Sequence, residues 1–241
     1  WGIGRQYARL LNNHGIITAR DLKHSPQKWI QKHLTIVGLR ILKELNGEPS
    51  IPLEELPPAK KGIICSRAFG KPITTLEELS EVISEYVSQA AQKLRAQNSA
   101  ASFLQVYVST SPFKPVTQYI NSITSTFLIP TSFIPDLIHK VKECVKKIYR
   151  SGYQYHDGGV FLGGLTSQKQ IQLSLFSPAD LIGRNKKTEL MATLDKVNKR
   201  WGRNTLQVAS QGTKKPWKMN QSFVSPHYTT HWEELPVVTA R

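Results

Sequence analysis

Cysteine is scarce in this chain of 241 residues, which contains only Cys65 and Cys144. Both are flanked by apolar residues, lie far apart and have no partner at metal-ligand spacing, so we expect buried free thiols in a reducing cytosol. No apolar stretch reaches the length of a membrane span, and no signal peptide is present. The sequence therefore argues against a disulfide scaffold, a zinc domain and a membrane protein.

Acidic residues are also few, with 17 Asp and Glu against 32 Lys and Arg and a formal net charge of +15. Such a surplus favours polyanionic partners, namely DNA, RNA or an anionic membrane surface, although a basic surface kept for solubility would give the same count. Residues 1–50, 51–176 and 177–241 each carry net positive charge, and no block of like charge occurs. The excess is therefore not confined to a basic tail.

The carboxylates form no recognisable catalytic constellation. A polymerase site needs paired carboxylates that hold two metal ions, whereas these acids fall in a linker or on predicted outer helix faces, as Asp195 does. His227 and His231 have the spacing of a metal pair only within a helix, and no Cys is nearby. Gly158-Gly159 and Gly163-Gly164 lie in or beside a predicted strand and indicate close backbone approach or a bulge, not a phosphate loop. We expect no catalytic residue, metal or cofactor in this chain.

The first two segments are a helical domain and a linker. Residues 1–50 predict short helices over 5–13, 26–33 and 38–46, with Thr18 and Asp21 as an N-cap pair. Residues 51–59 are rich in proline and read as an extended linker.

Residues 60–167 predict one α+β domain with the order β-α-β-β-α-β. Strands are expected over 62–69, 102–109, 125–129 and 158–165. One amphipathic helix follows the capping box at residues 75–78, and Pro135 opens another. The two helices would cover one face of a four-stranded antiparallel sheet and leave the other face open.

Residues 168–241 predict an irregular extension with one clear helix. Apolar residues on one face of that helix are Leu190, Leu194, Val197 and Trp201, and Gly202 ends it.

Two places are candidates for contact with a nucleic-acid backbone. The run Gly2-Ile3-Gly4, followed by Arg5, fits the hairpin of a helix-hairpin-helix element, in which helix N–H groups receive a phosphate; it also fits an ordinary turn. Lys60, Lys61, Ser66 and Arg67 lie at or in the first strand. They form either a solvated edge or the polar side of a strand that follows phosphates along the open sheet face, where Lys and Arg are expected. Because strands alternate, Arg67 does not share a face with both Ser66 and Ala68.

A short apolar peptide follows the last predicted strand, at Gln172, Leu173, Ser174, Leu175 and Phe176. Exposed apolar anchors on a polar segment suit a preformed pocket on a partner. A final strand that packs back on its own domain is the alternative.

Several stretches resemble the UmuC-type family of bacterial Y-family translesion DNA polymerases, the catalytic subunits of DNA polymerase V and its plasmid-borne relatives. Residues 63–70, Ile-Ile-Cys-Ser-Arg-Ala-Phe-Gly, resemble the opening strand of the family's little-finger domain. The resemblance continues in the same order over nearly the whole chain, at residues 1–5, 110–113, 202–205, 211–212 and 225–230.

The resemblance implies a role for each segment. Residues 1–50 would be the thumb, which holds the duplex backbone, and residues 60–167 the little finger, which lies in the major groove. Residues 172–176 match the family's clamp-binding pentapeptide, Gln-Leu-x-Leu-Phe, at every fixed position. The remainder of 168–241 would be the extension that the family associates with a UmuD-type accessory subunit and the recombinase filament.

The resemblance also implies that the catalytic palm with its Mg²⁺ lies before Trp1. The chain begins without Met and inside a motif, and we expect it to be a fragment of a longer protein. The resemblance thus implies a non-catalytic piece of an error-prone polymerase of the bacterial SOS response, located in the cytoplasm with the nucleoid. It would bind primer-template DNA without sequence preference and dock on the sliding clamp.

Three other functions fit parts of the sequence. A stand-alone RNA-binding module would place stacking aromatics on central strands, and the candidates are Phe69, Phe103, Tyr107 and Phe127, but the usual Arg/Lys-Gly-aromatic run is missing. A protein-interaction module without DNA contacts and an enzyme in its own right are the others.

Overall fold

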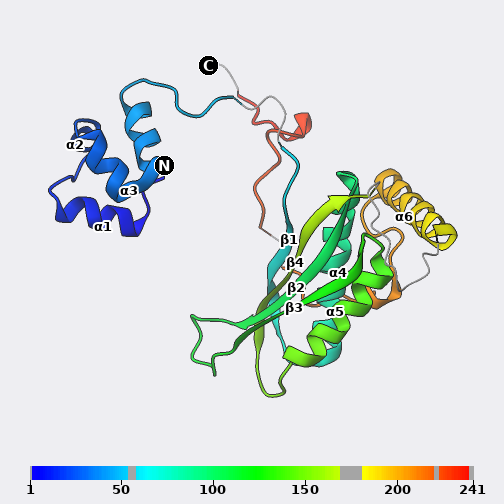
Figure 1. Cartoon of the computed structure of the whole chain (residues 1–241). Helices are drawn as coiled ribbons and strands as arrows, with labels where there is room; N and C mark the ends of the chain where they lie inside the picture. Colours follow the sequence, from blue (N-terminus) through cyan, green and yellow to red (C-terminus); the bar gives the residue numbers. More distant parts are fainter. Residues whose placement is uncertain (1, 54–57, 169–180, 220–222, 239–241) are drawn as a thin grey trace. The chain divides into compact units, whose positions relative to one another are not determined.

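The computed structural model describes residues 2–53, 58–168, 181–219 and 223–238 (Figure 1). The chain divides into two compact units, Trp1–Pro58 and Ala59–Arg241, and the boundary falls inside the proline-rich stretch 51–59. Each unit has its own hydrophobic core, so each is described by itself.

The first unit consists of the helices α1 (Arg5–Asn13), α2 (Ala19–Lys23) and α3 (Gln27–Leu45). Thr18 and Asp21 form a capping box at the start of α2: the Thr18 N–H donates to Asp21 Oδ2 at 2.8 Å, and the Asp21 N–H donates to Thr18 Oγ1 at 3.2 Å. These hydrogen bonds lower the pKa of Asp21. The predicted cap pair is confirmed.

Helix α3 contains an interruption at Thr35, whose φ of 65° is not helical. The two short helices predicted over 26–33 and 38–46 therefore exist, but they continue one another across this kink. The apolar side chains that close the unit's core are Leu11, Leu22, Ile30, Leu34 and Leu42.

The second unit contains a four-stranded antiparallel sheet in the order β1-β4-β2-β3. Its strands are β1 (Ile63–Ile73), β2 (Ser99–Thr110), β3 (Ile120–Thr131) and β4 (Tyr155–Ser167). The predicted α+β fold and the order β-α-β-β-α-β are confirmed. All four strands are longer than predicted: β1 begins one residue later but continues to Ile73, and the other three extend at both ends through further pairing with a neighbouring strand.

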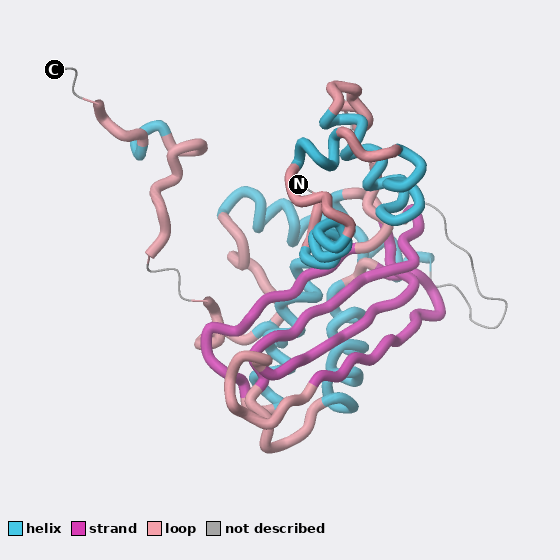
Figure 2. The backbone as a smooth tube through the Cα atoms, turned by 90° about the vertical axis from the view of Figure 1, so that its left-hand side faces the viewer, coloured by secondary structure: helices cyan, strands magenta, loops and turns pink. Residues whose placement is uncertain are grey.

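Helices α4 (Leu76–Ala96) and α5 (Ile134–Ile148) pack side by side on one face of this sheet. Figure 2 shows the strands from the other face, with these helices behind them. Thr75 caps α4 by accepting from the Glu78 N–H at 3.3 Å, as the sequence indicates. The other half of the predicted capping box differs, because the Glu78 side chain accepts from the Thr75 hydroxyl at 3.3 Å and not from the Thr75 backbone N–H. The inward residues of the strands and of both helices form one continuous core.

The C-terminal residues add a further layer on α4. Helix α6 (Leu181–Trp201) is tied to α4 by a two-pronged ion pair: Arg95 Nε and Nη2 each lie 2.7 Å from an oxygen of Asp195. A second ion pair joins Lys215 Nζ to Glu85 Oε2 at 2.6 Å, and both side chains are buried. The angles of this contact are not those of a hydrogen bond. Trp217 packs edge-to-face on Tyr86.

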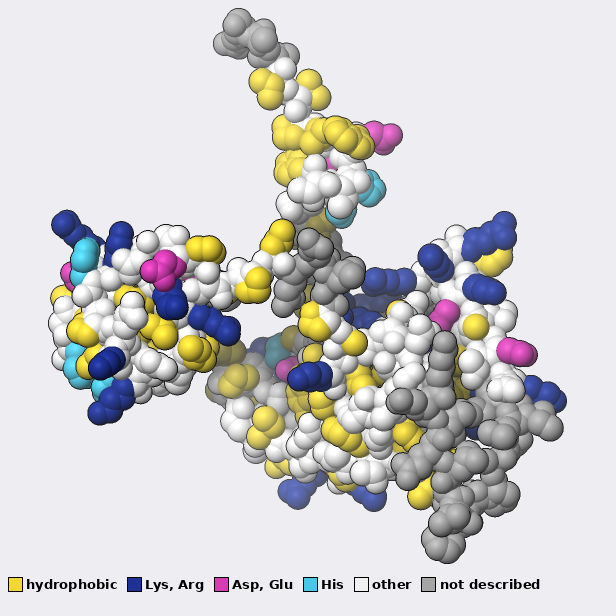
Figure 3. All heavy atoms as spheres, turned by 45° about the horizontal axis from the view of Figure 1, so that its top comes forward, with side chains coloured by type: hydrophobic (Ala, Val, Ile, Leu, Met, Phe, Trp, Pro, Cys, Tyr) yellow, Lys and Arg dark blue, Asp and Glu magenta, His cyan; other side chains and the backbone are white. Residues whose placement is uncertain are grey.

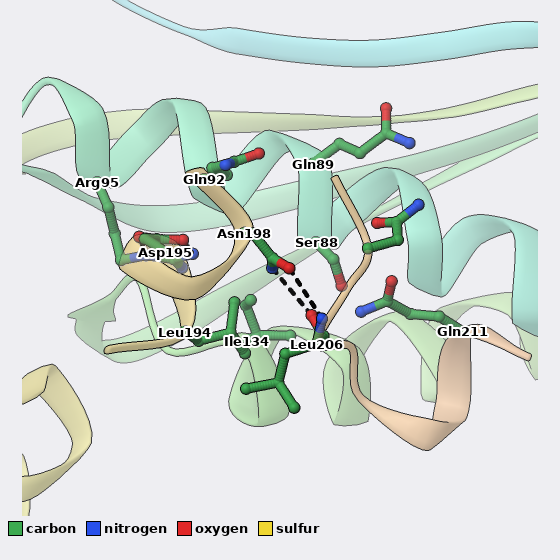
Figure 4. A pocket seen from close by; sticks show the side chains of 11 residues that line it. Ser88, Gln89, Gln92, Arg95, Ile134, Leu194, Asp195, Asn198, Leu206 and Gln211 are labelled. Carbon is green, nitrogen blue, oxygen red and sulfur yellow. Dashed lines mark hydrogen bonds and ion pairs between the residues drawn. The ribbon is translucent and has the colours of Figure 1, made fainter. Parts of the chain in front are cut away.

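A small polar pocket lies between α4, α6 and the short 3₁₀ helix η1 (Ala209–Gln211) (Figure 4). The Asn198 side chain closes it by exchanging two 2.9 Å hydrogen bonds with the backbone of Leu206. These hydrogen bonds hold the segment after α6 against that helix. The pocket thus lies where α6 packs against the segment that follows it.

The predicted apolar stripe of α6 is partly wrong. Leu190 and Trp201 are exposed, whereas Met191 is buried and Leu194 packs against the core. The helix is rotated relative to the prediction because the Asp195 ion pair, which hydrophobic periodicity cannot register, turns that side of α6 toward α4.

Another short 3₁₀ helix, η2 (Trp232–Glu234), lies near the C-terminus. Across the described ranges of the chain, no helix is both long and apolar enough to span a bilayer.

Candidate nucleic-acid interface

The run Gly2-Ile3-Gly4 leads into the N-terminus of α1, as predicted. Gly2 has a φ of 85°, a conformation that suits glycine, and a Cβ there would lie 2.6 Å from Ile41 Cδ1. Gly4 is the N-cap, and a Cβ there would meet nothing within 4 Å. Neither a side-chain cap nor an acidic residue occupies the first turn, and Arg5 is exposed. This helix end is therefore open to an anion.

Lys60 and Lys61 lie just before β1 with exposed side chains. The backbone of Lys60 is held by Gln97 at the C-terminal end of α4: its N–H donates to Gln97 Oε1 at 3.3 Å, and its carbonyl accepts from Gln97 Nε2 at 3.1 Å. The two side chains are thus exposed to solvent, while the backbone of Lys60 is anchored.

Ser66 and Arg67 point to opposite sides of β1. Ser66 lies on the uncovered face, opposite Gly159. Arg67 lies on the side of Cys65 and Phe69, which belong to the core, and its own side chain is exposed at the edge of the sheet. Burial raises the pKa of Tyr86, and the charge of Arg67 opposes that rise. The expectation that Arg67 lines the open face is therefore wrong.

The uncovered face contains hydroxyl, amide and aromatic side chains and the exposed aliphatic side chains of Ile64, Ile120 and Leu128, rather than cations. Strand alternation and register bring to it Ser66 from β1, Gln105 and Ser109 from β2, and Ser122, Thr124 and Thr126 from β3. Asp157 is the one charged residue that the described strands place on this face. The expectation that Lys and Arg line this face is wrong, because the cations lie at its rim and on the helices.

Three aromatic rings lie on the two central strands of this face, and we call Phe103, Tyr107 and Phe161 the aromatic platform. Each is half-buried. Each ring lies against a glycine, where a Cβ would come within 2.2 Å of Phe103 at Gly163, 2.5 Å of Phe161 at Gly62 and 2.7 Å of Tyr107 at Gly159. Gly159 and Gly163 of β4 therefore provide close approach, as predicted, and the rings of Phe103 and Phe161 are in tilted contact, with centroids 6.0 Å apart and an interplanar angle of 53°.

The hydroxyl group of Tyr107 is directed toward Ser66 and Asp157. Burial raises the pKa of Tyr107, the Ser66 hydroxyl lowers it, and the Asp157 carboxylate raises it. The phenol therefore stays neutral at neutral pH and serves as a hydrogen-bond donor at the edge of the platform.

Of the aromatics weighed from the sequence, Phe69 is buried in the core and Phe127 packs against it. Phe161 was missed by sequence reasoning. The sequence feature that could have identified Phe161 is Gly62, because an aromatic side chain on one strand often covers a glycine on the neighbouring strand.

The apolar peptide at residues 172–176 lies outside the described residues. Beyond α6, the described stretch 223–238 carries exposed apolar side chains, which Figure 3 shows in yellow at the top of the view. His227 and His231 are exposed there and both contact Glu234, at 3.1 and 3.6 Å. The backbone N–H of His227 lowers the pKa of Glu234.

Several carboxylates that could serve catalysis are engaged in structure instead. Glu85 and Asp195 form the ion pairs with Lys215 and Arg95, and Asp21 caps α2. In the ranges that the structure describes, no three His, Cys, Asp or Glu side chains come together as a metal site would require.

Two family models match the chain. Residues 60–175, which contain the sheet and helices α4 and α5, match the impB/mucB/samB family C-terminal domain. Residues 188–238, which contain most of α6 and the segment after it, match a domain of unknown function, DUF4113. The second unit thus contains an impB/mucB/samB-type C-terminal domain, followed by a segment that matches a second family model.

Relatives match over nearly all of the chain. Protein UmuC of Salmonella typhimurium is 40% identical over 236 residues, which are 98% of this chain and 56% of that protein. Protein MucB of Escherichia coli is 34% identical over 242 residues, which are 100% of this chain and 56% of that protein. DNA polymerase IV of Clostridium kluyveri is 23% identical over 220 residues, 87% of this chain and 52% of that protein. The chain belongs to the UmuC family and spans about half the length of the curated relatives it matches.

Proposed function

We propose that this chain holds DNA without sequence preference and docks on the sliding clamp on behalf of an error-prone translesion DNA polymerase. The observation that carries the proposal is the 40% identity to UmuC over 98% of the chain. The weaker similarity to DNA polymerase IV of Clostridium kluyveri supports the same activity class for the whole protein.

The charge of the chain supports the DNA-binding half of the proposal. A net charge of +15 supplies affinity for phosphates through counterion release, a contribution that does not depend on base sequence. The open N-terminus of α1 beside Arg5 and the anchored Lys60-Lys61 pair are contacts of this kind. Such contacts suit a polymerase that must accept distorted templates.

The pentapeptide at residues 172–176 supports the clamp-docking half. Leu173, Leu175 and Phe176 are apolar anchors in a polar context, which is the composition of a linear peptide that inserts into a preformed pocket. Docking on a ring that encircles DNA raises the effective concentration of the DNA-binding surfaces at the primer end.

The stretch 223–238 supports a further contact, with a UmuD-type accessory subunit and the recombinase filament. Phe223, Trp232 and Val237 are exposed there, and apolar or aromatic side chains of this kind act as anchors when a partner buries them.

Nucleotide transfer is proposed to belong to the whole polymerase and not to this chain. The engagement of Glu85, Asp195 and Asp21 in ion pairs and a helix cap supports this assignment. The residues that would hold Mg²⁺ belong, on this proposal, to another part of the polymerase.

The test is to change Leu175 and Phe176 together to Ala in the full chain and to measure binding to the sliding clamp and to duplex DNA. Clamp affinity should fall at least about thirtyfold, because even one anchor residue of such a peptide contributes about 2 kcal/mol or more. Duplex affinity should stay unchanged and should weaken steeply with salt.

The matched control is Leu190→Ala with Phe223→Ala, since both side chains are exposed and lie outside the pentapeptide. Unchanged clamp affinity in the Leu175/Phe176 variant would reject the peptide assignment. A duplex affinity that is flat between low and moderate salt would reject the DNA-binding assignment.

A further inference from the structure

The middle of the uncovered sheet face is poorly suited to phosphates. Its described strands contribute one charged residue, Asp157, which repels them. The backbone N–H groups of β4 and β2 are engaged in ladders with strands on both sides. Phosphates require cations or free N–H groups, so this region suits the bases of a nucleic acid better than its backbone.

The aromatic platform offers those bases partly exposed rings. Phe103, Tyr107 and Phe161 each lie against a glycine backbone and remain partly exposed, and the rings of Phe103 and Phe161 are tilted by 53° to each other. Aromatic side chains on central strands of a sheet can stack two or three bases of a single strand. Bases within a duplex are stacked on one another, so only unpaired bases can use such rings.

The three rings lie along the two central strands, where they can meet more than one base of a strand. Phe103 and Tyr107 are four residues apart on β2, which is about 13 Å at the usual rise of a strand. Phe161 is opposite Gln105, midway between them, on the neighbouring strand β4. Ser66 and the neutral Tyr107 hydroxyl provide polar groups for base edges.

Cations lie next to one end of the platform. The ring of Phe161 rests on Gly62, the residue that follows the exposed Lys60-Lys61 pair, whose backbone is anchored by Gln97. A strand whose base stacks on Phe161 therefore has two ammonium groups close to its phosphates. This combination of stacking rings and flanking cations is typical of single-strand binding sites.

We propose that the aromatic platform stacks unpaired bases of single-stranded DNA while Lys60 and Lys61 hold the adjoining phosphates. The inference rests on the proposed DNA-binding function and adds a substrate class to it. The open sheet face then serves the unpaired part of a template in addition to duplex.

The test compares the full chain with its Phe103→Leu and Phe161→Leu variants, using a labelled twelve-residue oligo-dT and a twelve-base-pair duplex. Each variant should bind the oligo-dT at least about fivefold more weakly, since one stacking contact contributes that much. Duplex affinity should change less than twofold. The matched control is Phe113→Leu, which lies between β2 and β3 with its side chain 94% exposed, and which should change neither affinity.

The salt dependence of binding distinguishes the stacking contacts from the phosphate contacts. Phe161→Leu should weaken oligo-dT binding without altering its salt dependence. Lys61→Ala should reduce the slope of log affinity against log salt by about one, because one phosphate contact is lost.

Stacking can also be detected without any variant. An oligonucleotide that carries 2-aminopurine should lose fluorescence on saturation with the unmodified chain if its base stacks on a ring.

Unchanged 2-aminopurine emission, or unchanged oligo-dT affinity in both Phe variants, would overturn the platform while leaving duplex binding intact. Absence of salt-dependent binding to either DNA would overturn the proposed function as well. Tighter binding of oligo-U than of oligo-dT would overturn the assignment to DNA.

Discussion

Two tryptophans of the C-terminal region have opposite environments. Trp217 is 5% exposed and packs against Tyr86 with ring centroids 6.0 Å apart, whereas Trp232 is 87% exposed. The carbonyl of Trp217 also accepts the Gly70 N–H at 2.8 Å, at the edge strand β1. Gly70 allows this approach, since a Cβ there would lie 2.3 Å from the Lys218 carbonyl oxygen.

Trp217→Ala should therefore destabilise the second unit by about 3 kcal/mol, the usual cost of removing a large buried aromatic side chain. Trp232→Ala should change the free energy of unfolding by less than about 0.5 kcal/mol. Urea unfolding followed by circular dichroism measures both. Equal effects of the two changes would contradict the packing of Trp217 in the core.

Sequence reasoning succeeded at the residue scale where the signal is local. The Thr18–Asp21 and Thr75–Glu78 caps follow from spacing alone, because their partners are three residues apart. The position of Trp217 could not be predicted in the same way. Its contact with Tyr86 spans more than a hundred residues, and no short-range pattern marks it.

At the scale of elements, α6 is held on α4 by a charge pair as well as by apolar contact. The Arg95 side chain is 9% exposed and that of Asp195 is 26% exposed, and Arg95 Nη1 also donates to the Ser132 carbonyl at 2.9 Å. A guanidinium in this position depends on its carboxylate, because a buried cation without a partner is costly.

Asp195→Asn should lower the stability of the second unit by about 2 kcal/mol and loosen α6, since it leaves the buried Arg95 charge without its counter-ion. The control is Asp136→Asn, which removes the same charge from an ion pair with Lys187 in which both side chains are about half exposed. Exposed pairs contribute little, so that change should cost less than about 0.5 kcal/mol. Thermal unfolding compares the two, and limited proteolysis should cut α6 faster in Asp195→Asn alone. Equal stability of both variants would show that the Arg95 pair does not hold the helix.

The order and type of the elements in the sheet domain were predictable, because periods of two and of three to four residues alternate clearly along residues 60–167. The rotation of α6 was not predictable, because its buried side combines Met191 and Leu194 with the Asp195 ion pair, which an apolar stripe does not register. The cation-free sheet face was missed for a related reason. Alternation fixes which residues share a side of β1. It does not show that β1 lies at the edge of the sheet, because that position follows from tertiary pairing. The edge position leaves Arg67 exposed beside the core.

At the scale of the whole molecule, the two units carry separate candidate contacts with DNA. The first has the open N-terminus of α1, and the second has Lys60, Lys61 and the aromatic platform. Each unit closes its own core, so neither depends on the other for its fold. The proline-rich stretch 51–59 is therefore predicted to act as a tether between these two candidate sites.

Tethering should make the joined units bind DNA far more tightly than the same units after separation. Binding of the first unit makes binding of the second an intramolecular event, at an effective concentration near the millimolar range for a short linker. A protease site introduced into the stretch 51–59 allows this to be tested on intact protein, because cleavage removes the tether and leaves every DNA contact in place.

Affinity for a twenty-base-pair duplex, measured at fixed salt before and after cleavage, should fall at least tenfold. The salt dependence should also become less steep, since each separate unit neutralises fewer phosphates than the pair does. Circular dichroism should stay unchanged on cleavage, which separates loss of the tether from loss of structure. An affinity that survives cleavage would mean that one unit alone supplies the contacts, and the Lys60 and Lys61 variants would then identify whether it is the second.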